Sequence, residues 1–164
     1  DGMDFDSIGR VREMREEFVN FLVKMECQLS ATFNCNKETT INSGRQMLRK
    51  FDAMMNRKLL GSRWSQPDRA YKRMKWFLFP ELTPTSGKLH YHGQIYFPPE
   101  SEDQIRRFLI LRNHIWSKCC KGGDVYVKKL DTVDARRKFA NYSLKSFWKE
   151  DQRENWIFSD EFQR

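Results

Sequence analysis

Two histidines, His90 and His92, stand two positions apart in a segment where apolar and polar residues alternate from 88 to 97. This alternation is typical of a β-strand with one buried face, and it puts both imidazoles on the polar face together with Gln94. Residues two apart on a strand lie about 6.5–7 Å from each other at Cα. The two imidazoles can therefore converge on one metal ion, with Gln94 as a reserve ligand. The alternative is a pair of histidines on the exposed side of an amphipathic strand.

A carboxylate precedes this strand in the sequence. Glu81 follows a short aromatic strand predicted at 75–79, and a turn-rich stretch at 83–87 separates it from the histidines. The two strands are predicted to pair as a hairpin, which brings the carboxylate beside His90 and His92. Two imidazoles and one carboxylate leave coordination positions open for water or phosphate oxygens. The pattern therefore predicts a catalytic rather than a structural site, for Mg²⁺ or Mn²⁺.

Tyr142 and Lys145 are the candidate catalytic residues. They stand three positions apart in a predicted helix that begins at Asp131 or Thr132 and ends near Trp148, and would therefore share one helical face. Beside a Lewis-acid metal, a tyrosine oxygen can attack a phosphodiester and form a covalent phosphotyrosine. A neighbouring lysine can stabilise the phosphate charge or lower the pKa of the tyrosine. The alternative is an ordinary amphipathic helix with a half-packed tyrosine and a solvated lysine.

Three other tyrosines are weaker candidates for the nucleophile. Tyr91 is predicted to be buried on the apolar face of the histidine strand. Tyr96 shares the histidine face but lies about 13 Å beyond His92 in Cα terms. Tyr126 alternates with two valines in a strand predicted at 124–130, so it could border the site and is the most serious rival.

These residues resemble the motifs of the HUH endonuclease domain of rolling-circle replication initiator (Rep) proteins, in the single-tyrosine class. The segment 90–92, His-Tyr-His, matches the His–hydrophobic–His pattern, and 142–145, Tyr-Ser-Leu-Lys, matches the Tyr-x-x-Lys motif. The segment 31–34, Ala-Thr-Phe-Asn, is similar to the family's first motif. Glu81 resembles the upstream acidic ligand in Reps of small circular single-stranded-DNA viruses. The resemblance covers about residues 28–147, and the helix predicted at 7–25 is an addition to it.

The resemblance implies a metal-dependent enzyme that nicks and joins single-stranded DNA at specific sequences. Its intermediate would be a 5′-phosphotyrosine, and the free 3′-hydroxyl would prime rolling-circle replication. The implied partners are a single-stranded origin, with a stem-loop, and a helicase. Residues 1–164 contain no Gly-x-x-x-x-Gly-Lys-Ser/Thr loop, so the helicase is expected C-terminal to this chain or in trans. Two alternatives stay open: a related HUH transposase or relaxase, and a non-catalytic nucleic-acid-binding module.

Charge also favours a nucleic-acid partner. The formal net charge is +8 and the pI is about 9.4, a balance that suits a polyanionic ligand. Basic and aromatic residues cluster on the outer face of a helix predicted at 43–60 and in the loop after it, where phosphate contacts and base stacking are expected. The predicted DNA-binding residues are Arg45, Arg49, Arg57, Lys58, Arg63, Trp64, Arg69, Tyr71, Lys72 and Arg73.

The periodicities predict the order helix, strand, helix, two strands, helix, strand, helix. This order predicts one α+β domain over 1–164: a largely antiparallel sheet of four or five strands with helices packed on it. The resemblance implies a ferredoxin- or RRM-like HUH endonuclease version of that fold. The four cysteines lack zinc-site spacing and are expected to be reduced, in an intracellular protein. The resemblance places such a protein in the host nucleus for a eukaryotic virus, or in the cytoplasm for a plasmid or phage, and no membrane partner is expected.

Overall fold

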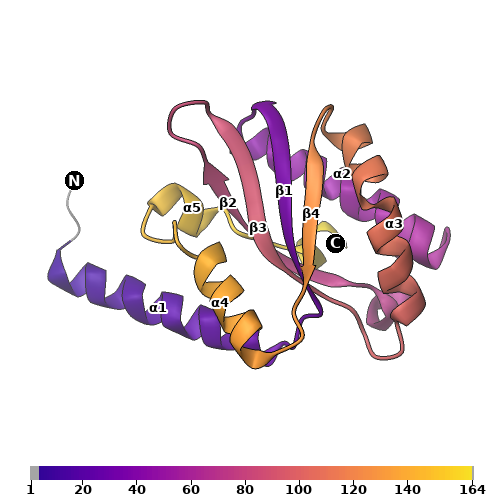
Figure 1. Ribbon diagram of the computed structural model, residues 1–164, viewed down its shortest axis with the longest axis horizontal. Coiled ribbons are helices and arrows are strands. Elements are labelled where there is room, and N and C mark those ends of the chain that lie inside the picture. The colour runs from indigo at the N-terminus through magenta and orange to yellow at the C-terminus, as the bar shows by residue number, and fades with distance from the viewer. Residues whose placement is uncertain (1–3, 164) are drawn as a thin grey trace.

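A five-stranded antiparallel sheet organises the chain, whose computed structural model describes residues 4–163 (Figure 1). The strand order across the sheet is β4-β1-β3-β2-β5. The bounds of the strands are β1 Leu29–Glu38, β2 Lys75–Leu82, β3 Lys88–Tyr96, β4 Asp124–Lys129 and β5 Ile157–Phe158. The predicted α+β fold with a largely antiparallel sheet is confirmed.

Five α-helices and two 3-10 helices connect or cover the strands within the described part of the chain. Their bounds are α1 Phe5–Lys24, α2 Ile41–Leu60, η1 Pro67–Lys72, α3 Glu102–Cys119, α4 Val133–Ser143, α5 Glu150–Glu154 and η2 Ser159–Gln163. The run β1-α2-β2-β3-α3-β4 with strands in the order 4-1-3-2 is the ferredoxin-like arrangement. None of the helices in residues 4–163 is long and apolar enough to cross a membrane.

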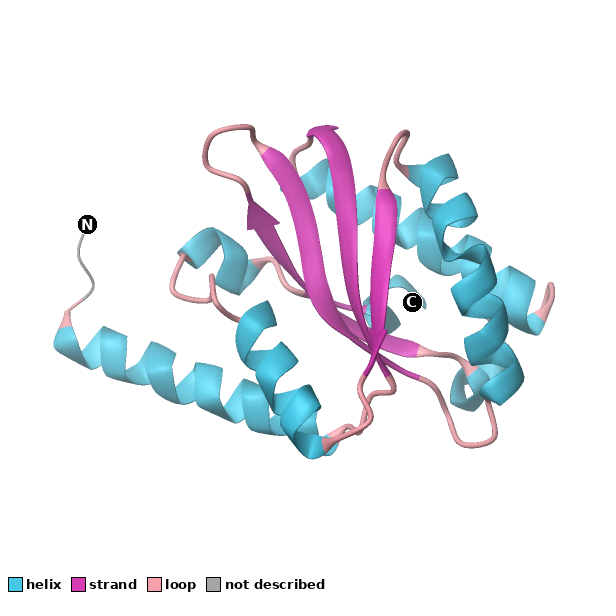
Figure 2. Cartoon of the chain, viewed as in Figure 1, coloured by secondary structure: helices cyan, strands magenta, loops and turns pink. Residues whose placement is uncertain are grey.

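The two faces of the sheet carry different layers of helix. Helices α2 and α3 cover one face, where alternate strand residues such as Phe33, Tyr91 and Ile95 join helix residues such as Phe51 and Trp116 in the main core. Helices α1 and α4 lie on the other side (Figures 1 and 2). There a second apolar cluster joins the two helices to Phe77 and Phe79 of β2. The rest of that face carries polar strand residues.

Strand β2 runs further than its sequence predicts. It continues through Pro80 and Glu81 to Leu82, instead of ending near Phe79. β5 pairs with β2 only at Phe77 and Leu78, so at Pro80 the missing N–H faces no strand and costs no ladder bond. The extension sets Glu81 directly opposite His90 of β3 in the register of the sheet.

Helix α4 is shorter than predicted, because it ends at Ser143 and not near Trp148. The next residues turn tightly, with the Lys145 N–H donating to the Tyr142 carbonyl at 3.2 Å. This turn folds Phe147 into the cluster between α1 and β2. Lys145 therefore lies in the turn after α4 and not on the helix.

Other differences are local. Helix α2 begins at Ile41 and not at the predicted position 43, because the Thr40 hydroxyl caps it by accepting from the Ser43 N–H. Between α1 and β1 the chain turns at Glu26, which has a positive φ of 54°, and β1 begins at Leu29. The C-terminal tail packs against the sheet as β5 and η2, and its Ser159 hydroxyl accepts from the Trp76 N–H.

Candidate active site

The sheet face beneath α4 presents its side chains in three rows, which the strand register defines. The first row runs Asp124, Asn34, His90 and Glu81 across β4, β1, β3 and β2. The second row runs Tyr126, Thr32, His92 and Phe79, and the third runs Lys128, Ser30, Gln94 and Phe77. Residues of one face repeat every second position, so the His–hydrophobic–His spacing alone puts the two histidines in adjacent rows.

His92 is the centre of this face and is only 4% exposed. Its Nε2 atom lies 3.2 Å from Oε2 of Glu81, and its Nδ1 atom lies 3.1 Å from the hydroxyl of Thr32. The hydroxyl can serve either tautomer of the ring, and it fixes the ring so that Nε2 points toward the carboxylate. The interaction with Glu81 is diagonal, because His90 and not His92 stands opposite Glu81 in the register.

The environment keeps His92 neutral. Burial lowers the pKa of its imidazole to about 4, although the Glu81 carboxylate acts in the opposite direction. A neutral imidazole is the form that binds metals. If the proton is on Nδ1, the lone pairs of Nε2 and Glu81 face each other at 3.2 Å, and a cation between them would relieve that repulsion.

Tyr142 and Lys145 meet this pair from above. The ring of Tyr142 packs edge-on against the His92 ring, with the two centroids 5.0 Å apart. The Lys145 Nζ atom lies 3.3 Å from Oε1 of Glu81 and 4.4 Å from the centroid of the Tyr142 ring. Burial acts to lower the pKa of Lys145, but Glu81 and Tyr142 outweigh it and raise this pKa above its ordinary value. The lysine therefore stays cationic beside both the carboxylate and the phenol.

Three predicted metal ligands lie on this face, and two of them are in contact. His90 is half-buried, and its ring centroid is 6.1 Å from that of His92. Within residues 4–163, no three His, Cys, Asp or Glu side chains are gathered closely enough to hold an ion as they stand. The closest pair nevertheless fits an ion, since adjacent ligands of an octahedral Mg²⁺ at 2.0–2.1 Å lie about 2.9 Å apart. The Nε2–Oε2 separation of 3.2 Å is near that value.

Gln94, the predicted reserve ligand, is fully buried beneath α4. Its amide nitrogen donates to the Arg136 carbonyl at 3.1 Å, which ties the side chain to the helix. Gln94 therefore holds α4 against the sheet, and its amide nitrogen is engaged by the helix and not by the histidine site. Tyr91 is fully buried, as predicted, whereas Tyr126 is 58% exposed.

A groove of about 480 Å³ opens beside Tyr142, between α4 and the β4 edge of the sheet. Three aromatic rings line it, from Tyr126, Phe139 and Tyr142, and the side chains of Lys128 and Lys138 rise from its two walls. Both lysines are exposed, as are Tyr126 and Tyr142. Sequence reasoning did not identify this groove, although the alternation of Tyr126 and Lys128 on one face of β4 was a signal that could have pointed to it.

The predicted DNA surface lies elsewhere. Helix α2 packs on the sheet face opposite His92, so Arg45, Arg49, Arg57 and Lys58 are separated from the site by the sheet itself. Arg45 is moreover paired with Glu161 at 2.5 Å. The other predicted contacts follow α2, in or beside η1: Arg63, Trp64, Arg69, Tyr71, Lys72 and Arg73.

Two members of that set need correction. Trp64 and Arg73 are each 8% exposed, and the Arg73 guanidinium donates to the Trp64 carbonyl at 3.2 Å. Both side chains are committed to the interior, so neither presents a face for stacking or phosphate binding. Arg63 is exposed but pairs with Asp68 at 3.4 Å, and the exposed Tyr71 carries the Lys72 ammonium over its ring.

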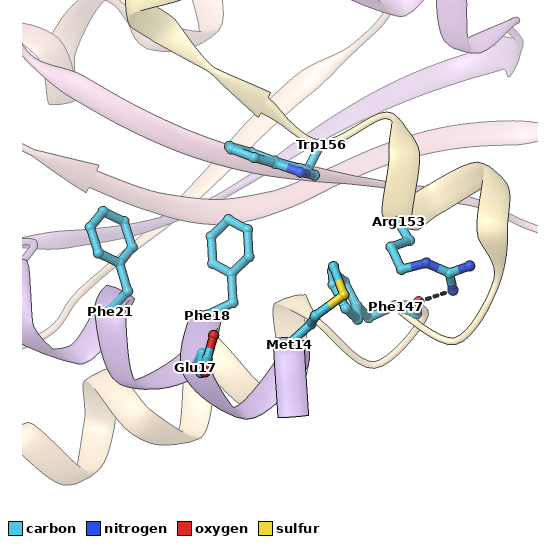
Figure 3. A pocket seen from close by; sticks show the side chains of 7 residues that line it. All are labelled: Met14, Glu17, Phe18, Phe21, Phe147, Arg153 and Trp156. Carbon is cyan, nitrogen blue, oxygen red and sulfur yellow. Dashed lines mark hydrogen bonds between the residues drawn. The ribbon is translucent and has the colours of Figure 1, made fainter. Parts of the chain in front are cut away.

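A second, apolar hollow of about 370 Å³ lies beside α1 and away from the histidines (Figure 3). Phe18 and Phe21 of α1 point from one side of it toward Trp156, and Phe147 and Arg153 close another side. The Phe18 ring packs edge-on against Trp156 at 4.8 Å and Phe79 at 5.1 Å between centroids. These contacts fasten α1 to β2, the strand that carries Glu81.

No family model, curated protein or solved structure matches this chain. The chemistry available to the site therefore follows from its own residues. A buried neutral imidazole, a carboxylate, a lysine and an exposed phenol meet at one end of a cationic aromatic groove.

Proposed function

We propose that this chain is a metal-dependent endonuclease that nicks and rejoins single-stranded DNA through a covalent tyrosine intermediate. The observation that carries the proposal is the meeting of four side chains from three segments: Tyr142 and Lys145 from the end of α4 and its turn, Glu81 from β2, and His92 from β3. An exposed phenol beside a cation and a candidate metal ligand pair has the parts that phosphodiester transfer needs.

In the proposed reaction Tyr142 Oη attacks the scissile phosphorus, and the bond from phosphorus to the 3′-oxygen breaks. The DNA remains attached through a 5′-phosphotyrosine, and the 3′-oxygen gains a proton equivalent to the one that Tyr142 loses. Lys145 holds positive charge next to the phenol, where it would stabilise the negative charge of the phosphate under attack. Reversal of the same steps rejoins the strand without an external energy source.

His92 and Glu81 are the residues that would hold a divalent ion, with His90 in the next row as the third candidate ligand. Mg²⁺ or Mn²⁺ bound there would supply positive charge to the non-bridging phosphate oxygens. Thr32 orients the His92 ring through Nδ1, as outer hydrogen-bond partners do for metal-binding histidines.

The groove beside Tyr142 supports a single-stranded substrate. Aromatic side chains stack on bases of any sequence, and lysines neutralise the backbone. Tyr126 and Phe139 can supply the first function, and Lys128 and Lys138 the second. A DNA strand lying in this groove would pass the Tyr142 hydroxyl at one end of the groove. Initiation of rolling-circle replication at a stem-loop origin, with a helicase acting afterwards, is the process that we propose for this activity.

The test is covalent capture. Wild-type protein is incubated with Mn²⁺ and single-stranded oligonucleotides that carry a randomised central segment, and adducts are isolated on a denaturing gel and sequenced. We expect a denaturant-resistant adduct that enriches one sequence and that Tyr142→Phe abolishes, while Tyr126→Phe keeps it. An adduct that survives in Tyr142→Phe would reject Tyr142 as nucleophile. Binding of the oligonucleotides without any adduct would favour the second candidate, a non-catalytic module that uses the same groove.

A further inference from the structure

Helix α1 reaches the catalytic helix through one arginine. The Arg15 guanidinium donates three hydrogen bonds to the end of α4: from Nε to the Leu144 carbonyl at 3.1 Å, from Nη1 to Asn141 Oδ1 at 3.1 Å, and from Nη2 to the Asn141 carbonyl at 2.9 Å. Asn141 and Leu144 flank the Tyr142–Ser143 pair. One rigid, planar side chain therefore fixes the backbone on both sides of the proposed nucleophile.

The end of α4 needs such a partner. The last carbonyls of a helix receive no hydrogen bond from an N–H of the same helix, and the helix dipole favours a cation at this end. Within α4 and its cap, no basic residue occupies the last turn. Arg15 supplies both the donors and the charge, and it does so from a segment 126 residues away in sequence from Asn141.

Helix α1 is itself well anchored on both sides of Arg15. Val11, Val19 and Leu22 join Ala140 and Leu144 of the α4 segment in one buried cluster. Phe18 and Phe21 form the aromatic side of α1 (Figure 3). They fasten α1 to β2, since their rings lie 5.1 Å from that of Phe79 and 5.4 Å from that of Phe77, respectively. Helix α1 thus links the strand that carries Glu81 to the helix that carries Tyr142.

We propose that Arg15 is a positioning residue for the nucleophile: it holds the turn that sets Tyr142 and Lys145 against Glu81 and His92. This inference rests on the proposed function. Loss of the guanidinium would remove the donor to the Asn141 carbonyl, leave the Leu144 carbonyl with the Phe147 N–H as its remaining donor, and let this turn move. Displacement by about 1 Å of a reacting group can cost on the order of 100-fold in rate. DNA binding in the groove would be affected far less, because Arg15 is not among its lining residues.

The experiment compares Arg15→Ala, Arg15→Lys and Arg12→Ala, using the oligonucleotide that wild-type protein captures. Arg12 is an exposed residue of the same helix and lines the same surface hollow as Arg15. Arg12→Ala therefore removes the same charge as Arg15→Ala but leaves the hydrogen bonds of Arg15 in place. We expect the rate constant of adduct formation at saturating DNA to fall at least about 10-fold in Arg15→Ala. The half-saturating DNA concentration should stay within about twofold, since only positioning is lost. Arg15→Lys should recover part of the rate, and Arg12→Ala should match wild type.

A second readout does not depend on activity. The Leu144 N–H donates to the Ala140 carbonyl and the Lys145 N–H to the Tyr142 carbonyl, and both amides should exchange with solvent faster in Arg15→Ala. If Arg15→Ala does not fold, the rate loss must appear in Arg15→Lys. Equal adduct rates in wild type and Arg15→Ala would overturn the role of Arg15 alone. Absence of an adduct with wild-type protein would overturn the proposed function, and the positioning role with it.

Discussion

Oε1 of Glu81 lies 3.3 Å from Nζ of Lys145, so the carboxylate predicted to bind a metal is also the ion-pair partner of the cation predicted to act on phosphate. The other carboxylate oxygen faces His92 at 3.2 Å. One side chain therefore connects the candidate metal ligands to the Tyr-x-x-Lys segment. A metal ion bound by Glu81 would compete with the Lys145 ammonium for the negative charge of the carboxylate. The ammonium would then be free to bind a phosphate.

His92→Ala should weaken Mn²⁺ binding at least about 100-fold, since even outer hydrogen-bond partners of metal ligands are worth about 10- to 100-fold. Adduct formation should be lost with it. The measurement is titration calorimetry with Mn²⁺ on both proteins, with melting of the metal-free forms as a check on folding. His114→Ala, at an exposed position of α3, is the matched control and should bind Mn²⁺ like wild type. Unchanged Mn²⁺ affinity in His92→Ala would remove this histidine from the site.

Lys145→Ala should slow adduct formation by about 100-fold, the lower end of the cost of removing one donor that stabilises charge in a transition state. The side chain is 43% exposed, so its removal should disturb packing little. Single-turnover rates at saturating DNA are the measurement. The control is Lys149→Ala, an exposed lysine four positions on, which should react at the wild-type rate. Equal rates for Lys145→Ala and wild type would show that the ion pair with Glu81 is structural only.

The parts of the site that sequence predicts well are those that short-range periodicity determines. Strand alternation is enough to place His90 and His92 on one face and to bury Tyr91, and both outcomes hold. The predicted contact between Glu81 and the histidine strand also holds, because a hairpin leaves few registers open. The sequence does not predict which histidine Glu81 contacts. The carboxylate contacts His92 diagonally, although Glu81 stands opposite His90 in the strand register.

The parts that sequence predicts poorly depend on which face each helix covers. The basic residues of α2 and η1 are numerous, but their count contains no information about which side of the sheet α2 packs on. Leu48 and Phe51 turn α2 toward the face opposite His92. The role of Arg15 is hidden for a related reason, because its partner Leu144 lies 129 positions away and an arginine on an amphipathic helix has no distinctive pattern.

Gly93→Ala should destabilise the protein by about 3 kcal/mol or more, in the range of severe overpacking. A Cβ atom at Gly93 would lie 1.7 Å from the Phe77 carbonyl oxygen, so β2 must move away from β3, and Glu81 with it away from His92. Urea unfolding is the measurement. Gly9→Ala in α1 is the control, since its Cβ meets nothing within 4 Å, and it should stabilise by about 0.5–1 kcal/mol. If Gly93→Ala leaves the free energy of unfolding unchanged, β2 and β3 are not held this closely.

Two surfaces could bind DNA, and matched charge reversals distinguish between them. In one variant Lys128 and Lys138, from the groove beside Tyr142, are changed to Glu, and in the other Arg49 and Arg57 of α2 are changed to Glu. All four positions are exposed, and the two variants change the net charge equally. A long-range effect of charge would therefore weaken DNA binding alike in both.

We expect the groove variant to lose far more affinity for single-stranded oligonucleotides, because direct phosphate contacts add to the general field. The measurement is fluorescence anisotropy over a range of salt concentrations. Each phosphate contact removed should reduce the log–log salt slope by about 0.7 for a single strand. Tyr126→Ala, which removes a candidate stacking partner, should weaken binding by about 1–3 kcal/mol without changing that slope. If the α2 variant loses the larger share of affinity and of slope, the strand binds on the face opposite His92. DNA bound there could not reach Tyr142, so this outcome would contradict both the groove and the nicking reaction proposed for it.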